Sequence, residues 1–362
     1  MYQQALRTGQ KIFATAPMID WSDRHYRYFA RQLTKNAVLY TEMIVADAIL
    51  RGNRDKLLGY DAVERPLALQ LGGNDPEKLA QAARIGEQFG YDEINLNVGC
   101  PSDRVQSGTF GACLMREPQL VADCVAAMKA AVKIPVTVKC RIGVDDQDPE
   151  VALRDLVARI KAAGVDAVWV HARKAWLQGL SPKENRDIPP LDYGLVRRLK
   201  AENENLFIGL NGGLHTLKQA VDEIGRPGEG LDGAMLGRAA YQDSGMLAGV
   251  DAVFAHPLSH ACAAEPLPNP SPQGGGTFAP DLAFREGVRD AMMAYAARVI
   301  GDGGRLNHVT RHMVGLFQGF PGARRYRQIL SADATKPGAG PEVIDAAFAA
   351  VLDASAAKAA AE

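Results

Sequence analysis

The chain has 362 residues, of which 47% are hydrophobic and 23% are charged, so it supplies a large core and exceeds one small domain. Its formal net charge of -1 provides no overall attraction for nucleic acid, and any RNA-binding surface must therefore be local. Five scattered cysteines without a CxxC pair argue against a disulfide framework or a metal site and favour the reducing cytoplasm.

The N-terminal part of the chain alternates short apolar runs with amphipathic stretches. The polar first ten residues are expected to lead directly into a strand, without a signal peptide, and no apolar run is long enough to cross a bilayer. Two amphipathic stretches, 75–90 and 148–164, begin with Asp-Pro and end in glycine, as helices do. Eight runs of β-forming residues begin at Lys11, Ala37, Arg65, Glu93, Ile134, Val165, Leu206 and Leu231.

This alternation predicts parallel strands that are covered by helices on both faces. Eight such units in roughly 240 residues fit an α/β fold of the (β/α)8 TIM-barrel type. A doubly wound sheet is the alternative, but it normally needs fewer strands, and the first loop lacks a GxGxxG motif. We therefore expect a catalytic barrel over residues 1–250.

The pattern changes after the barrel. Residues 251–282 are rich in proline and glycine and show no periodicity, which is typical of a linker or insertion. Helical patterns return over residues 281–301, 305–320 and 341–362. The sequence thus predicts a small, all-helical C-terminal domain over residues 283–362 with an alanine-rich tail.

The seventh and eighth strands end in glycine-rich segments. Chemistry in a TIM barrel lies at the C-terminal ends of the strands, and the last two loops commonly hold phosphate. Asn-Gly-Gly alone is a common turn, but here it follows a strand and is paired with an arginine after the next one, which favours phosphate binding. The predicted cradle consists of Asn211, Gly212, Gly213, Gly237 and Arg238.

Gln70, Lys139 and His171 are expected to face the space inside the barrel mouth. An amide and a fixed cation fit the polar edge of an isoalloxazine ring, where charge collects on reduction. A lone histidine is more often a core residue bonded to a neighbour. A lysine within an apolar strand, however, is costly to bury unless something pairs with it.

Cys100 follows the fourth strand in a Gly-Cys-Pro turn that directs its side chain toward this pocket. An inert buried thiol is the usual role of a cysteine, and we expect it for Cys113, Cys124, Cys140 and Cys262. At a strand end a catalytic role is favoured. A nucleophile needs a lowered pKa and a nearby base, whereas a thiol near the reference pKa of about 8.5 stays protonated and can serve as a general acid. The residues alone leave both roles open.

Residues 303–331 contain no Asp or Glu, so their basic side chains form a local positive surface suited to RNA phosphates. The interleaved Phe317, Phe320 and Tyr326 are expected to pack in the core. The basic residues of this segment are Arg305, Arg311, Arg324, Arg325 and Arg327, with His308 and His312.

A second basic cluster recurs at helical spacing after the first strand. It is either a solvated helix face or a contact at the rim of the site. Its members are Arg24, Arg27, Arg31 and Lys35.

Several of these segments together resemble the dihydrouridine synthase family. They are LNVGCPSDRVQSGTFGACLM around Cys100, and TAPMIDWSDRHYR, LQLGGNDP, VKCRIGVDD, VHARKAWLQGLSPKENR, LNGG and LGRAAY. They match the subgroup that modifies D-loop uridines at positions 20 and 20a of tRNA. The resemblance covers about residues 11–255 and resumes in RLNHVTRHMVGLFQGFPGARRYR, whereas His256 to about Pro280 departs from the family pattern.

The resemblance implies FMN that is reduced by NADPH and passes a hydride to C6 of the uracil ring, while Cys100 gives the proton to C5. It implies tRNA as the partner, bound at its D-loop and elbow, and no membrane or protein partner. Asn97 and Arg141 would contact the uracil, and Lys183 and Arg186 the tRNA. The flavin would be held by Pro17, Met18, Ile19, Gln70, Lys139 and His171, with the phosphate cradle at its far end.

Two other functions are compatible with parts of the sequence. A flavin barrel that reduces a free pyrimidine or an enone would keep the barrel and the cradle but leave the basic helical segment without a purpose. A non-catalytic tRNA-binding protein would not need Asn97, Cys100, Lys139 and His171 together.

Overall fold

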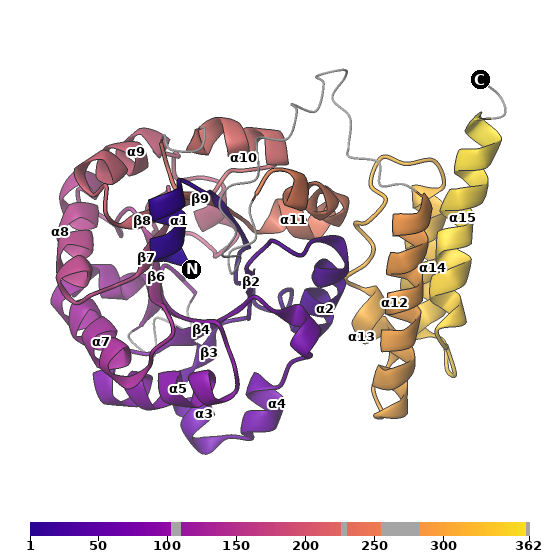
Figure 1. Cartoon of the computed structure of the whole chain (residues 1–362), viewed down its shortest axis with the longest axis horizontal. Coiled ribbons are helices and arrows are strands. Elements are labelled where there is room, and N and C mark those ends of the chain that lie inside the picture. The colour runs from indigo at the N-terminus through magenta and orange to yellow at the C-terminus, as the bar shows by residue number, and fades with distance from the viewer. Residues whose placement is uncertain (103–109, 226–229, 255–281, 360–362) are drawn as a thin grey trace.

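The structure is a computed structural model that describes residues 1–102, 110–225, 230–254 and 282–359. Its strands form one parallel sheet in the order β1-β9-β8-β7-β6-β5-β4-β2, and β3 pairs with β4 as well. A parallel bridge between Ala14 and Val38 joins the two sheet edges, so the sheet curls into a barrel ringed by helices (Figure 1). The strands are β1 (Ile12–Thr15), β2 (Leu39–Tyr40), β3 (Ile44–Val45), β4 (Leu67–Gly72), β5 (Glu93–Val98), β6 (Val136–Arg141), β7 (Ala167–His171), β8 (Phe207–Asn211) and β9 (Gly233–Leu236).

The predicted TIM barrel is confirmed, with one difference in its second strand. The run from Ala37 was expected to form a single strand, but it forms β2 and β3, which both pair with β4. Between them the Thr41 hydroxyl accepts a hydrogen bond from the Gln70 backbone N–H at 3.0 Å. A side chain thus replaces a backbone partner, and the strand is interrupted there.

Helices follow the strands around the barrel. Asp75 accepts hydrogen bonds from two backbone N–H groups at the start of α5 (Pro76–Gln88), and Asp148 accepts one at the start of α8 (Pro149–Ala162). Both Asp-Pro starts therefore act as predicted, since the proline needs no donor at that position. The other barrel helices are α2 (Arg24–Leu33), α3 (Ala46–Arg51), α4 (Arg54–Leu58), α7 (Pro118–Ala131), α9 (Tyr193–Glu202), α10 (Leu217–Ile224) and α11 (Arg238–Gln242).

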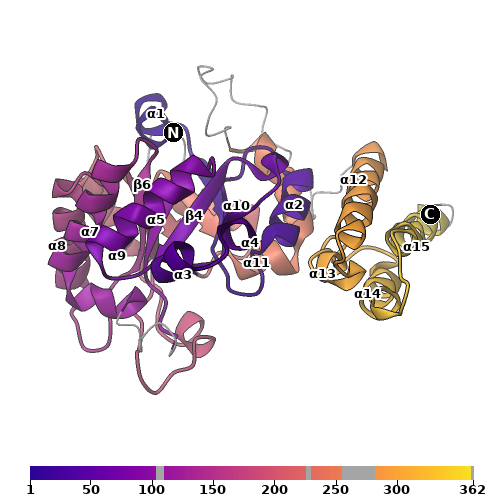
Figure 2. The same cartoon turned by 90° about the horizontal axis from the view of Figure 1, so that it is seen from below.

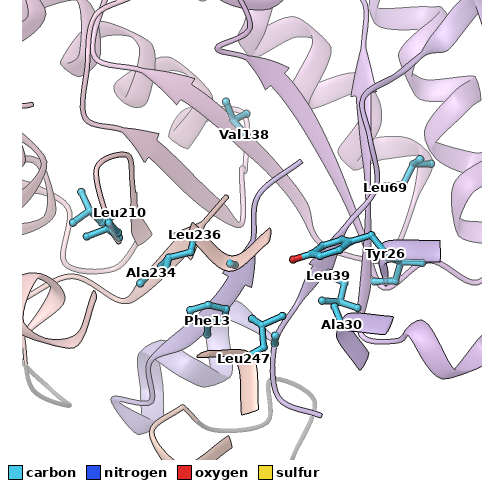
Figure 3. Packing of buried hydrophobic residues seen from close by; sticks show 14 of the residues in the cluster. Phe13, Tyr26, Ala30, Leu39, Leu69, Val138, Leu210, Ala234, Leu236 and Leu247 are labelled. Atoms are coloured by element: carbon cyan, nitrogen blue, oxygen red, sulfur yellow. The ribbon is translucent and has the colours of Figure 1, made fainter. Parts of the chain in front are cut away.

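Apolar side chains pack on both faces of the sheet, as parallel strands require. Toward the helices, Tyr26 and Ala30 of α2 pack beside Phe13 and Leu39 of the strands (Figure 3). A separate cluster fills the barrel interior, with Ile12, Ala14, Tyr40, Ala68, Trp169, Phe207 and Met235 among its members. The interior is therefore a packed core, and a ligand can enter only at an end of the barrel.

The N-terminal segment does not lead directly into β1, contrary to expectation. Residues Tyr2–Thr8 form helix α1, which ends at Gly9 in a left-handed conformation with φ 69°. The helix covers the N-terminal end of the barrel (Figure 2), where the Tyr2 hydroxyl donates to Glu93 at 2.6 Å. Seven residues are too few to show clear helical periodicity, and the stabilising contacts are distant in sequence.

Arg27 and Arg31 are buried, so the cluster to which they belong is neither a solvated face nor a rim contact at these two positions. Arg27 forms a 2.7 Å ion pair with Glu64, whose side chain is 1% exposed. Arg31 donates to the carbonyl oxygens of Thr34, Ala37 and Glu64. Spacing of four places both arginines on the inner face of α2.

Four helices lie beside the barrel next to α2 (Figures 1 and 2). They are α12 (Leu282–Gly301), α13 (Leu306–Thr310), α14 (Ala323–Ala332) and α15 (Glu342–Ala359). The helix expected over 305–320 ends as α13 at Thr310, and α14 was not predicted. Gly315 and Gly319 interrupt the apolar pattern between them. The described residues contain no helix with the length and apolar character to span a bilayer.

The aromatic residues of this region pack in its interior, as predicted. Phe317 and Tyr326 are 2% and 0% exposed, and their rings meet edge to face with a centroid distance of 4.9 Å. Phe320 packs against the same core. Most of the predicted linker, including residues 255–281, lies outside the described residues.

Candidate active site

The strand register gathers the predicted polar residues at the C-terminal end of the barrel. Arg141 is paired with His171, and His171 with Asn211, so these three residues lie at one level on β6, β7 and β8. Asn97 on β5 pairs with Lys139 on β6, which precedes Arg141 by two residues. Alternating residues of a strand share a face, and the five side chains therefore belong to one inner surface.

Lys139 and His171 have polar atoms that no described residue satisfies. The His171 Nε2 atom is buried without a hydrogen-bond partner. Burial, followed by the positive charge of Arg141, lowers the pKa of His171 well below its usual value. The same two causes, in the same order, lower the pKa of Lys139 to about 8, and no carboxylate of the described residues compensates its charge. A partly buried cation without an anionic partner points to a ligand that brings negative charge or hydrogen-bond acceptors.

Asn97 holds the turn that carries Cys100. Its Oδ1 atom accepts hydrogen bonds from the backbone N–H groups of Gly99 at 3.0 Å and Cys100 at 2.9 Å. Its Nδ2 atom donates to Oε1 of Gln70 at 2.8 Å. The Cys100 thiol donates to the Ser102 hydroxyl at 3.4 Å and is partly exposed. Three of the predicted site residues are thus directly connected.

Arg141 is anchored from the side of the loops. Its Nη1 atom donates to the carbonyl of Asn185 at 2.8 Å and to that of Lys174 at 3.2 Å, and its Nε atom to the carbonyl of Gly99 at 3.2 Å. Burial is the main cause that lowers the pKa of Arg141 to about 9. The guanidinium therefore ties the Cys100 turn to the loop after β7.

Gly212 and Gly213 form a cradle that no other residue could form. Their φ angles are +99° and +68°, which L-residues rarely adopt. A Cβ on Gly212 would lie 2.4 Å from the His171 ring, and one on Gly213 2.4 Å from Leu191. The loop is fixed by the Tyr193 hydroxyl, which donates to the Gly212 carbonyl at 2.6 Å. Glycine is therefore required here by the path of the backbone and by its packing against His171 and Leu191.

The remaining cradle residues lie beside the loop after β1. A Cβ on Gly237 would come within 3.3 Å of the Met18 sulfur, which shows that the two segments are in contact. Pro17 is half-buried, and Ile19 is 50% exposed. Arg238 forms a two-contact ion pair with Asp187, the shorter at 2.6 Å. Lys183 and Arg186 are exposed in the same loop as Asp187.

Two of the other cysteines differ from Cys100 in burial, whereas Cys113 is partly exposed like Cys100 and is not the buried thiol that was expected. Cys124 and Cys140 are fully buried, and burial raises the pKa of each thiol to about 12. Burial also raises the pKa of Cys113, whose thiol donates to the Phe110 carbonyl. Cys262 lies outside the described residues. Within the described ranges, no group of three His, Cys, Asp or Glu residues could hold a metal.

The basic residues of the helical region divide into two groups. Arg305, Arg324 and Arg325 are exposed. Arg311 is exposed too, but its guanidinium contacts Asp23 of the barrel at 2.5 Å. It therefore joins the helices to the barrel.

Several residues of the site were not predicted from the sequence. Asn185 is buried and bonds to the backbone of Trp176, which shapes the loop after β7. Tyr193 and Asp187 hold the cradle and Arg238. Their residue types are common in loops, so no signal short of the fold itself could have selected them.

Fold and site together define a TIM-barrel enzyme with a cationic, glycine-lined mouth and a cysteine at the end of one strand. The model of the dihydrouridine synthase (Dus) family matches residues 14–352. The chain belongs to the dihydrouridine synthase family. This membership confirms the family and the class of oxidoreductase expected from the sequence.

Individual relatives align over nearly the whole chain. The tRNA-dihydrouridine(20/20a) synthase of Shewanella oneidensis is 52% identical over 341 residues, which cover 94% of each chain. The Escherichia coli K12 protein of the same name is 50% identical over 343 residues, 94% of this chain and 92% of the relative. A solved 2-naphthoyl-CoA reductase complex aligns with 69% of this chain and 52% of its own, at a TM-score of 0.50 and 11% identity, and is similar in fold alone.

Proposed function

We propose that this chain binds FMN and uses NADPH to reduce uridine to 5,6-dihydrouridine at positions 20 and 20a of the tRNA D-loop. The observation that carries the proposal is that an uncompensated cation, Lys139, and the turn that bears Cys100 lie in the same barrel mouth. The names of the relatives, which align over almost the entire chain, support the choice of tRNA and of these positions.

The residues of the mouth fit FMN. The unpartnered Nε2 atom of His171 and the charge of Lys139 suit the polar groups of the flavin ring. The positive-φ glycines 212 and 213 would let backbone N–H groups approach its phosphate. Pro17, Met18, Ile19, Gln70, Asn211, Gly237 and Arg238 would complete the cofactor site. When bound, FMN supplies the hydride that reduces the C5–C6 bond of the uracil.

Cys100 would supply the proton that the carbon C5 requires. A thiol can do this only if its position relative to the ring is fixed, because proton transfer needs hydrogen-bonding distance. Asn97 and Arg141 restrain the Gly99–Cys100 peptide group that leads into the thiol. The same two side chains would contact the uracil edge, Asn97 with its amide and Arg141 with the part of its guanidinium that faces the mouth.

The exposed arginines of the helical region would bind the tRNA backbone. Arg305, Arg324 and Arg325 lie in the segment without acidic residues, so no neighbouring carboxylate of that segment competes for them. Lys183 and Arg186, in the exposed loop after β7, would contact the tRNA close to the mouth. A uridine of folded tRNA must be swung out to reach the barrel, and backbone contacts around the mouth would hold the displaced strand. The unpaired cysteines support the cytoplasm as the place of action.

The test starts from purified protein and tRNA that lacks dihydrouridine. We expect a yellow protein that releases FMN on heating and, with NADPH, forms dihydrouridine at positions 20 and 20a. Equal turnover of free uridine would favour a reductase of small molecules instead. A colourless protein that cannot be reconstituted with FMN but binds tRNA would contradict the enzymatic proposal.

A further inference from the structure

A row of buried, hydrogen-bonded side chains runs through the barrel from its closed end to the Cys100 turn. Its bonds join Asn97 to Gln70 at 2.8 Å, Gln70 to Asn95 at 2.8 Å and Asn95 to Thr137 at 2.7 Å, and Thr137 donates to Glu93. The sheet register makes this possible, since Gln70, Asn95 and Thr137 lie at one level on three neighbouring strands. We call this row the polar chain; its members are Glu93, Thr137, Asn95, Gln70 and Asn97.

The direction of every bond in the polar chain is fixed from both of its ends. At the upper end the backbone N–H groups of Gly99 and Cys100 can only donate, so Asn97 must turn its oxygen toward them and its nitrogen toward Gln70. At the lower end Glu93 can only accept when it is ionised, and Thr137 then donates to it and accepts from Asn95. The two requirements agree, and each amide has a single satisfactory orientation.

Glu93 itself lies at the opposite end of β5 from the Cys100 turn. It is 0% exposed, at the start of β5, and accepts hydrogen bonds from the hydroxyls of Tyr2 at 2.6 Å and Tyr40 at 2.5 Å. The rest of the barrel interior is largely apolar, and burial of a carboxylate there costs free energy that its hydrogen bonds serve to offset. Its presence here therefore calls for a role other than stability.

We propose that Glu93 is a positioning residue, which orients the amides of Gln70 and Asn97 through the polar chain and thereby holds the turn that carries Cys100. The inference deepens the proposed function and rests on it only where it concerns the reaction that the turn supports. With Glu93 ionised, every donor of the polar chain points along it in the direction of Glu93. One N–H and one lone pair of the Gln70 amide then remain for the flavin, each on a fixed side.

The experiment compares variants at two links of the polar chain with a control in a partly buried ion pair elsewhere. Glu93→Gln keeps the shape and removes the charge, while Thr137→Val separates the site from a Glu93 that retains Tyr2 and Tyr40. The control is Lys200→Met, which breaks the Lys200–Asp232 pair, with side chains 13% and 14% exposed, outside the polar chain. The readouts are the rate at which iodoacetamide alkylates Cys100, followed by peptide mass, the visible spectrum of bound flavin, and kcat for dihydrouridine formation.

In both polar-chain variants, Glu93→Gln and Thr137→Val, Cys100 is expected to be alkylated faster and the flavin bands to shift. The kcat of each should fall about ten- to a hundredfold, the range for misplaced site residues. Lys200→Met should leave all three unchanged even if it melts earlier. The double variant should be no worse than the more severe single one, because both cut the same chain.

Alkylation rates and flavin spectra like those of the native protein in both polar-chain variants would overturn the inference. Losses of kcat that multiply in the double variant would overturn it as well. If Glu93→Gln fails to fold, Thr137→Val alone decides, because it leaves the carboxylate in place. Alkylation of Cys100 needs neither flavin nor tRNA. If the native protein cannot bind FMN, the proposed function is refuted, but the alkylation rates still test the polar chain.

Discussion

Replacing Glu93 by glutamine is expected to remove a large part of the pH dependence of stability. Burial is the main cause that raises the pKa of Glu93 from 4.5 to about 7, and Asp166 raises it further, although Thr137, Tyr2 and Tyr40 donate to it and lower it. Between these two values the folded chain holds a proton that the unfolded chain has lost. The free energy of unfolding therefore falls as the pH rises, by about 3 kcal/mol in all and about 2.5 kcal/mol between pH 5 and pH 8.

The assay is the thermal unfolding midpoint of the cofactor-free native chain and of Glu93→Gln at several pH values. All other groups are shared, so the difference between the two curves isolates Glu93. Relative to the native chain, the variant should gain a few degrees from pH 5 to pH 8. Glu77→Gln, an exposed position in the first turn of α5, removes the same charge and should give a parallel curve. A parallel curve for Glu93→Gln as well would refute the reasoning.

Three further predictions concern the proposed site. Cys100→Ala should retain flavin and tRNA binding but lose most dihydrouridine formation in single-turnover assays, and full activity would exclude its role as the acid. Lys139→Met should weaken FMN binding at least about tenfold in fluorescence titrations, and unchanged affinity would contradict the assignment. It should also raise the melting temperature of the cofactor-free protein, because it removes an uncompensated, partly buried charge. Arg324→Ala combined with Arg325→Ala should weaken tRNA binding and flatten its dependence on salt, whereas Arg51→Ala, 78% exposed on α3, should leave the salt slope as it is.

The barrel could be predicted because its strands carry their own signal. Parallel strands that are buried on both faces leave continuous apolar runs, and these can be read without knowing which strands pair. Once the order of strands is that of a TIM barrel, Arg141, His171 and Asn211 must lie near one another, since each ends a neighbouring strand. The positions of the predicted site residues could thus be inferred from the apolar runs of the strands and from the strand order of a TIM barrel.

Ion pairs and hydrogen bonds between side chains far apart in sequence could not be predicted in this way. Arg27 and Arg31 have the spacing of an exposed helix face, and only the position of Glu64 shows that they are buried. Arg238 was expected to face a phosphate and meets Asp187, 51 residues away in sequence. Tyr2 bonds to Glu93 across 91 residues. A sequence gives residue types and spacing, but the charge that compensates another charge depends on the folded path of the chain.

Glu93 and Lys139, two costly ionisable groups inside the barrel, are compensated in different ways. This difference indicates where the ligand binds. Glu93 receives hydrogen bonds from Tyr2, Tyr40 and Thr137, and its end of the barrel is covered by α1. Lys139 has no such partner among the described residues, and its end is open to the loops. An anionic ligand would raise the pKa of Lys139 and stabilise the fold in proportion to its binding free energy. The barrel is therefore built so that its closed end is complete by itself and its mouth is completed by what it binds.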